Sequence, residues 1–184
     1  MSYRLIEKQV IFSGVKIRLE LHHLEDEDGI RVRREVCVHP GAVVILPFLD
    51  ADTILLIRNR RYTIGQILTE LPAGGLEKNE DPMNAAGREL VEETGYLAGR
   101  LSRLIDFYSS PGILSEKMYT FAAYDLQKVG QKLEADEEIE VMAVKFDDAI
   151  GMIRDRQIMD AKSIATILLY ERFFRANGTM DEHR

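Results

Sequence analysis

The segment from Gly74 to Tyr96 constrains this chain most strongly, because it predicts one short helix with both of its ends marked. Asp81 can cap the N-terminus with its carboxylate, and Pro82 suits the first helical position. Gly95 is the residue type that commonly ends a helix in the left-handed conformation. Since the residues between these markers are compatible with a helix, the relative positions of their side chains can be predicted.

Three glutamates crowd one face of this predicted helix. Residues three and four apart are neighbours on a helix surface, so Glu89 faces both Glu92 and Glu93. Each like-charge pair is unfavourable, and carboxylates in the last turn also oppose the helix dipole. Local rules broken in this way often mark a functional site, and carboxylate oxygens at this density suit Mg²⁺ or Mn²⁺ bound to phosphate. The glutamates therefore indicate metal-dependent chemistry on a phosphate ester or phosphoanhydride.

The flanking residues decide between this interpretation and a merely solvated acidic face. Five residues separate Gly74 from Glu80, seven more lead to Arg88, and residues 88–96 read RELVEETGY. This segment resembles the Nudix box, whose pattern is G, five residues, E, seven residues and then R-E-U-x-E-E-x-G-U, where U is a bulky apolar residue. Every specified position matches, with Tyr96 bulky but partly polar. By this resemblance, Glu80 is the acid that closes the loop and has a structural role.

The resemblance implies a hydrolase that acts on a nucleoside diphosphate linked to another group. It makes Glu89 and Glu93 the principal metal ligands, with Glu92 close by as a ligand or catalytic group and the backbone carbonyl of Ala73 as a further ligand. Arg88 lies next to Glu89 and four residues before Glu92, so it can orient both carboxylates and belongs to the catalytic set.

Composition agrees with one enzyme domain in a reducing compartment. With 184 residues and 46% hydrophobic content, the chain can bury one substantial core, but it is short for two full domains. The net charge of −7 argues against nonspecific binding to nucleic acid, which depends on lysine and arginine. Cys37 is the only cysteine, and no run approaches the roughly 20 apolar residues of a membrane span. We therefore expect a soluble, cytoplasmic protein without nucleic-acid or membrane partners.

The resemblance implies an α/β (α+β) fold, with a mixed β-sheet core sandwiched between helices. We expect a β extension over residues 1–40 as the dimerisation element, the Nudix hydrolase domain over 41–176, and a loose tail over 177–184. Residues 41–48 and 53–58 read as a hairpin of buried strands, and helical periodicity is seen at 147–154 and 161–176. Further strands are predicted by apolar patterning at 3–13, 15–24, 30–38, 101–108, 117–126 and 139–146.

Four features outside the box resemble the branch of the family that acts on ADP-ribose and nucleotide sugars. The first two are ELPAG at residues 70–74 and RNRRY at 58–62, where Asn59 replaces the usual glutamine. The third is the run SPG at residues 110–112, whose proline lies sixteen residues beyond Gly95. The fourth is the acidic run DEEIE at 136–140.

These features suggest how the substrate is held. Guanidinium groups match phosphate oxygens, so Arg61 is expected to bind a phosphate. Glu70, Pro111 and Gly112 are the other expected substrate-binding residues, by resemblance. A mobile carboxylate can position and deprotonate the attacking water, and Glu137 is the first choice for this role, with Glu138 second.

The expected reaction is hydrolysis of ADP-ribose to AMP and ribose 5-phosphate. Another nucleotide sugar, such as GDP-mannose or a UDP-sugar, remains the nearest alternative because the same metal helix serves all of them. A catalytically silent nucleotide sensor is an alternative of another class, and an RNA-end hydrolase is disfavoured by the acidic charge balance. Branch members form homodimers whose N-terminal strands cross to the partner, so a homodimer is expected here as well.

Overall fold

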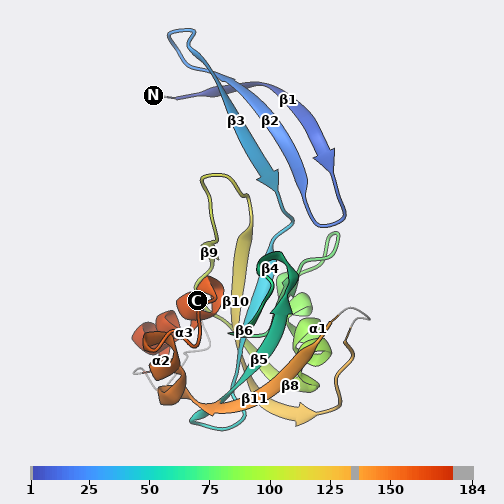
Figure 1. Cartoon of the computed structure of the whole chain (residues 1–184), viewed down its shortest axis with the longest axis vertical. Helices are drawn as coiled ribbons and strands as arrows, with labels where there is room; N and C mark the ends of the chain where they lie inside the picture. The colour runs from blue at the N-terminus through green and yellow to red at the C-terminus, as the bar shows by residue number, and fades with distance from the viewer. Residues whose placement is uncertain (1, 134–136, 176–184) are drawn as a thin grey trace. The chain divides into compact units, whose positions relative to one another are not determined.

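A computed structural model describes residues 2–133 and 137–175, and the chain divides into two compact units (Figure 1). One unit consists of Met1–Gly41 and Phe107–Lys117, and the other of Ala42–Asp106 and Met118–Arg184. The segments of each unit are therefore distant in sequence.

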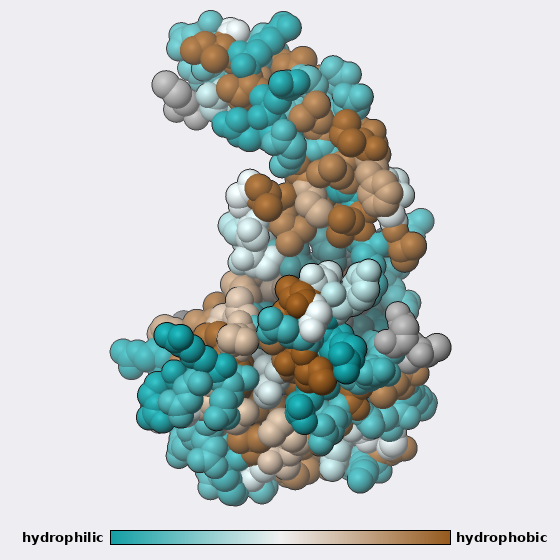
Figure 2. Space-filling view, in the orientation of Figure 1, coloured by the Kyte–Doolittle hydropathy of each residue, from teal (hydrophilic) through white to brown (hydrophobic). Residues whose placement is uncertain are grey.

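The first unit contains an antiparallel sheet of three strands, β1 (Arg4–Ser13), β2 (Arg18–Glu25) and β3 (Arg31–Val38), in that spatial order. The loop that includes β9 (Phe107–Tyr108) joins the end of β3, where the Cys37 amide donates to the Ile113 carbonyl at 2.8 Å. All ten residues of β1 are exposed. Hydrophobic residues consequently reach the surface of this sheet (Figure 2).

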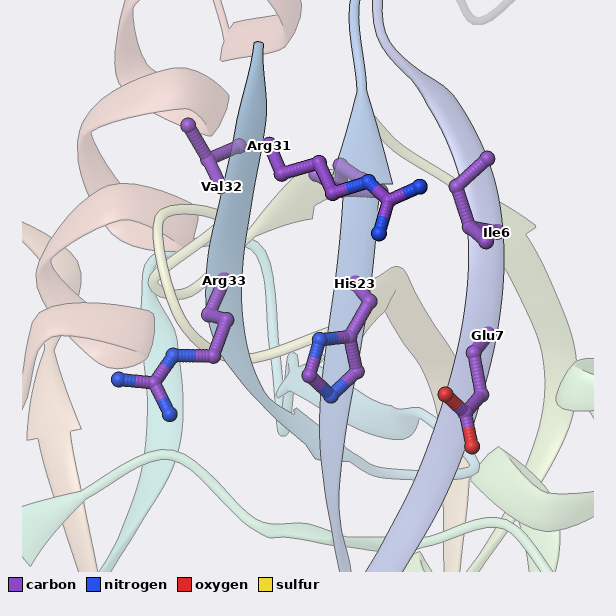
Figure 3. Close-up of a pocket in the computed structure, with 7 residues that line it drawn as sticks. Ile6, Glu7, His23, Arg31, Val32 and Arg33 are labelled. Carbon is purple, nitrogen blue, oxygen red and sulfur yellow. The ribbon is translucent and has the colours of Figure 1, made fainter. Parts of the chain in front are cut away.

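A cavity of about 320 Å³ lies on this sheet (Figure 3). All three strands supply its lining residues, which are Ile6, Glu7, His23, Leu24, Arg31, Val32 and Arg33. Only one of them is a carboxylate, so the cavity does not have the donor set of the metal site expected from the sequence.

The second unit is built on two sheets. The mixed sheet has the order β7 (Ala73–Gly75), β4 (Ala42–Pro47), β10 (Lys117–Lys128) and β8 (Tyr96–Arg103), with β10 parallel to β4 and antiparallel to β8. The second sheet is antiparallel, in the order β11 (Ile139–Lys145), β5 (Thr53–Arg61) and β6 (Gln66–Glu70). Every residue of β4 is buried, as expected for an apolar strand covered on both faces.

Helices cover the sheets of this unit on opposite sides (Figure 1). Helix α1 (Pro82–Thr94) packs on β4 and β10, and a core forms from Val43, Ile45, Ala85, Ala86, Leu90, Phe121 and Ala123. Helices α2 (Phe146–Arg154) and α3 (Ala161–Tyr170) lie on the other side. Two single turns complete the secondary structure of the described residues, a 3₁₀ turn at Tyr62–Ile64 and a π-helical turn at Glu171–Arg175. The mixed sheet between helices confirms the predicted fold class.

Several predicted elements differ in detail. The predicted hairpin at 41–48 and 53–58 is wrong, because β4 and β5 lie in different sheets, and the two segments share a single isolated bridge, between Phe48 and Ile54. The predicted strand at 101–108 is divided, with β8 ending at Arg103 and β9 starting at Phe107. Strands β6 and β7 were not predicted at all. The tail at 177–184 lies outside the described residues, as does residue 176, where the last helix was expected to end.

The helices within the described part of the chain are all too short or too polar to cross a membrane.

Candidate active site

Both ends of α1 are fixed by the residues that the sequence analysis identified. The Asp81 side chain accepts hydrogen bonds from the amides of Met83, at 2.9 Å, and Asn84, at 3.4 Å. Gly95 has a φ of +74°, and its amide donates to the Val91 carbonyl at 2.9 Å. A Cβ at Gly95 would lie 2.6 Å from the Gln131 amide nitrogen, so a glycine is required both by conformation and by space.

Residues 129–132 cover the C-terminal end of this helix. The amides of Val129 and Gly130 both donate to the Gly95 carbonyl, and the Gln131 side chain donates to the Glu93 carbonyl at 2.6 Å. The Lys132 amide donates to the Glu92 carbonyl at 3.1 Å. Carbonyls that a helix end would leave without partners are thereby satisfied. This crossing places residues 129–132 against the end of α1 that carries Glu92 and Glu93.

Arg88 connects the carboxylates of the loop and the helix. Its Nε and Nη2 both donate to Glu80 at 3.0 Å, and Nη2 also reaches the Gly75 carbonyl at 3.2 Å. Its Nη1 donates to Glu89 at 2.7 Å and to Glu92 at 2.9 Å. The hydrogen bonds between Arg88 and Glu80 are the main reason why the pKa of Arg88 is raised. The same bonds lower the pKa of Glu80. The guanidinium therefore holds both helix carboxylates in fixed orientations.

Glu93 and Glu89 face the loop that precedes the helix. Glu93 is only 3% exposed, and its Oε2 accepts a hydrogen bond from the Ala73 amide at 2.8 Å. The Glu89 carboxyl lies against Gly74, where an added Cβ would be 2.0 Å from the Glu89 Cδ. Burial raises the pKa of Glu93 to about 8 and also raises the pKa of Glu89. A cation placed beside these two carboxylates would relieve that cost.

The two candidate residues of the acidic loop have different surroundings. The negative charge of Glu137 raises the pKa of both Glu89 and Glu93, so this carboxylate lies close enough to interact with the helix site. Glu138 instead accepts a hydrogen bond from Arg60 Nε at 2.9 Å, in a side chain that is 72% exposed. Asp136, which starts the predicted loop, lies outside the described residues.

Arg61 is held by a carboxylate that solvent does not reach. Its Nε and Nη2 donate to the two oxygens of Glu70 at 2.8 and 2.5 Å, and Glu70 is 0% exposed. Glu70 also accepts a hydrogen bond from Lys162 Nζ at 2.7 Å. Glu70 therefore contacts Arg61 and Lys162 in this structure and has no surface for a ligand. No sequence motif marks Lys162, which lies 92 residues from Glu70 along the chain.

Pro111 and Gly112 lie in the first unit, whereas the other predicted site residues lie in the second. They form an exposed turn in which the Ser110 carbonyl accepts hydrogen bonds from the amides of Ile113, at 3.1 Å, and Leu114, at 2.9 Å.

A divalent cation fits the chemistry of the helix site. The side chains offer hard oxygen donors, two carboxylates are largely removed from water, and Gly74 leaves room for Glu89 beside the backbone of the loop. Within residues 2–133 and 137–175, no three His, Cys, Asp or Glu side chains are gathered closely enough to hold an ion. Arg88 occupies Glu89 and Glu92, and the Ala73 amide occupies Glu93. Each of these bonds engages one oxygen of its carboxylate, so binding of a metal requires the side chains to come closer together but not to give up their bonds to Arg88 and Ala73.

Comparison with known proteins supports the resemblance to the Nudix family. The NUDIX domain model matches residues 38–166. The chain is 39% identical to an ADP-ribose pyrophosphatase of Bacillus subtilis over 91% of both chains, and 33% identical to a methanol dehydrogenase activator of Bacillus methanolicus over 89% of this chain and 90% of that protein. It is 36% identical to a GDP-mannose pyrophosphatase of Yersinia pestis over 67% of both chains.

A solved structure, described as the crystal structure of an ADP compounds hydrolase, has the same fold. Its TM-score is 0.85 at 23% identity, with 97% of each chain covered. The family model covers well over half of this chain and includes the whole carboxylate helix with its preceding loop. The chain therefore belongs to the Nudix family of hydrolases.

Proposed function

We propose that this protein hydrolyses the pyrophosphate bond of ADP-ribose and releases AMP and ribose 5-phosphate. The observation that carries the proposal is the pair of buried carboxylates, Glu89 and Glu93, facing the Ala73–Gly74 backbone beside the Arg88 guanidinium. The choice of ADP-ribose is supported by the Bacillus subtilis relative, which matches over nearly the full length of both chains. GDP-mannose is the second choice of substrate, because the match to a GDP-mannose pyrophosphatase covers only 67% of this chain.

The metal is proposed to be Mg²⁺, with Mn²⁺ as a substitute. Glu89, Glu93, Glu92 and the Ala73 carbonyl would hold it, and when bound it supplies neutralisation and polarisation of the diphosphate. Arg88 keeps the carboxylates oriented through its bonds to Glu89 and Glu92.

Arg61 and Glu137 act on the substrate and the water. Arg61 uses Nε and Nη2 for Glu70, and its Nη1 is directed to a phosphate oxygen. Glu137 accepts the proton of the attacking water, a role supported by its electrostatic interaction with both helix carboxylates. Glu138 is the second choice, since it is engaged with Arg60. Pro111 and Gly112 shape a substrate-binding turn, and Glu70 contributes through Arg61.

A homodimer in the cytoplasm is part of the proposal. Strand β1 has no buried residue although it carries Leu5, Val10, Ile11 and Phe12, so these apolar side chains are exposed within the part of the chain that the structure describes. A second copy of the chain is the proposed cover. Light scattering is expected to give the dimer mass, and Val10→Lys is expected to shift it toward the monomer. A monomer mass for the unmodified protein would refute this part.

The deciding experiment measures hydrolysis of ADP-ribose, GDP-mannose, UDP-glucose and a capped RNA, with Mg²⁺, with Mn²⁺ and with a chelator. AMP from ADP-ribose as the main product, lost with the chelator, is the expected result. A preference for another nucleotide sugar would refute the substrate and keep the reaction type. No turnover of any of them would refute the enzymatic proposal in favour of a binding role.

A matched pair of variants tests the metal assignment. Glu93→Gln keeps the shape of a proposed ligand but removes its charge, so turnover is expected to fall by about 10²-fold or more. Glu77→Gln makes the same change in an exposed side chain of the preceding loop and is expected to leave turnover unchanged. Equal turnover in both variants would show that Glu93 is not a ligand.

A further inference from the structure

The first turn of α3 contacts Glu70, the carboxylate that binds Arg61, although this turn lies outside the Nudix box. Lys162 has a side chain only 13% exposed, and its Nζ lies 2.7 Å from Glu70 Oε2 and 3.0 Å from Asp160 Oδ2. Asp160 caps the helix by accepting from the Ser163 amide at 3.0 Å. Lys162 is thereby fixed by the same residue that fixes the start of the helix.

Glu70 lies between two cations. Arg61, at the end of β5, donates to both oxygens of Glu70, and Lys162, in the first turn of α3, donates to Oε2. Together with Asp160, the group contains two positive and two negative charges, so the buried Glu70 carboxylate has cationic partners on both sides. Among the described residues, removing the lysine would leave Arg61 as the one cation paired with a carboxylate that has no exposed surface. The orientation of the carboxylate then depends on one partner alone.

We propose that Lys162 is a positioning residue for Arg61: it fixes the Glu70 carboxylate so that the guanidinium is presented to a phosphate oxygen of the substrate. The phosphate contact rests on the function proposed above, whereas the contact from Lys162 through Glu70 to Arg61 does not. Since Glu93 is among the charges that act on Arg61, the guanidinium lies near the carboxylates of the helix site. A small displacement of Arg61 would accordingly change the position of the bound diphosphate and lower the rate of hydrolysis.

The same turn also holds the backbone that leads to the metal loop. The Ser163 hydroxyl donates to Asp160 at 2.6 Å and accepts from the Leu71 amide at 2.7 Å, and Ser163 is fully buried. Leu71 follows Glu70 and is followed by Pro72, whose carbonyl accepts from the Ile45 amide at 2.9 Å. The α3 turn thus holds the side chain of Glu70 through Lys162 and the adjacent backbone through Ser163.

The direct test needs no substrate. Solvent exchange of the Arg61 Nε proton is followed by NMR, with the signal assigned by its loss in Arg61→Lys. In the unmodified protein exchange is expected to be slow, because the proton is donated to a buried carboxylate. Lys162→Met is expected to speed the exchange several-fold, and Lys162→Arg, which keeps the charge, is expected to retain most of the protection. Unchanged exchange in Lys162→Met would overturn the proposal.

Kinetics test the consequence for the substrate. Lys162→Met is expected to raise the KM for ADP-ribose about tenfold, with a smaller fall in kcat, because a charge-assisted contact to the phosphate is weakened. In an Arg61→Ala background the same change is expected to add nothing, since the lysine acts through Arg61. Additive losses in this double-mutant cycle would overturn the positioning role. Faster proton exchange with unchanged KM and kcat would uphold the contact and refute the phosphate role of Arg61.

Two further variants control for charge and for folding. Lys145→Met also removes a positive charge. Lys145 ends β11 and is paired with Thr53 at the start of β5, whereas Arg61 lies at the opposite end of β5. This variant is expected to change neither the Arg61 proton exchange nor the KM. Lys162→Gln keeps a hydrogen-bond donor toward Glu70 and serves as the second variant if Lys162→Met does not fold. Its proton exchange is expected to lie between those of Lys162→Met and the unmodified protein, and exchange as slow as in the latter would overturn the proposal.

Discussion

Replacing Gly74 by alanine is expected to disable the site without unfolding the protein. The new Cβ would lie 2.0 Å from Glu89 Cδ and 2.1 and 2.2 Å from its two oxygens, whereas ordinary contact begins near 3.4 Å. The Glu89 carboxyl would have to move by about 1.4 Å, and a misplacement of about 1 Å can cost about 10²-fold in rate. We therefore expect kcat/KM for ADP-ribose to fall about 100-fold, equivalent to about 2.7 kcal/mol.

Stability is expected to change little in this variant. The group in the way is the end of a flexible side chain, and Gly74 is not among the glycines with positive φ, so the backbone can stay where it is. The free energy of unfolding in urea should remain within about 1 kcal/mol of the unmodified value.

Gly75→Ala is the matched control for the Gly74 experiment. A Cβ at Gly75 meets nothing within 4 Å, and its carbonyl contact with Arg88 is a backbone contact that alanine keeps. Steady-state hydrolysis with Mg²⁺ and urea unfolding are measured for both variants. Full activity of Gly74→Ala, or an equal loss in Gly75→Ala, would refute the reasoning that Glu89 must occupy this space for catalysis.

Three further predictions concern stability. Ser163→Ala leaves the buried Leu71 amide without its 2.7 Å acceptor and should lower the free energy of unfolding by about 1–3 kcal/mol in urea titrations; an unchanged value would contradict the role of this bond. Gly95→Ala places a Cβ against the Gln131 backbone at positive φ and should cost at least about 1 kcal/mol by the same measurement. In metal-free protein the pKa of Glu93, raised to about 8 from 4.5, means that the folded state keeps a proton that the unfolded state releases, so stability should fall as the pH rises from 4.5 to 8. Glu93→Gln should remove this decline, and a decline of the same size in that variant would assign it to another group.

The helix and its carboxylates could be predicted because their signals are local. Asp81, Pro82 and Gly95 act within one turn of the helix ends, and the spacing of Glu89, Glu92 and Glu93 follows from helix geometry alone. Residue types and intervals along the chain are enough for such features.

The remaining parts of the site depend on contacts that sequence spacing does not encode. Lys162 and Glu70 are 92 residues apart. The resemblance of residues 70–74 marks Glu70 as a substrate-binding residue, but nothing along the chain links it to Lys162 until the fold brings the two together. The hairpin prediction failed for a related reason: β4 and β5 are adjacent in sequence, but β4 pairs with β7 and β10. Tertiary pairing overrode the local preference for joining neighbouring strands.

The parallel pairing of β4 with β10 has a consequence for the folding pathway. It joins Ala42 to Met118 and Pro47 to Ala123, about 76 residues apart, so closing this pair carries a large entropic cost and is expected to be slow. Helix α1 lies within the enclosed segment and packs on Phe121 and Ala123 of β10, so we expect its final position to be reached only once β10 is in place. Divalent ions should then leave the refolding rate unchanged and slow unfolding, because the ion-binding environment is completed only after the rate-limiting step. Refolding that accelerates with Mg²⁺ would show that the carboxylates assemble early.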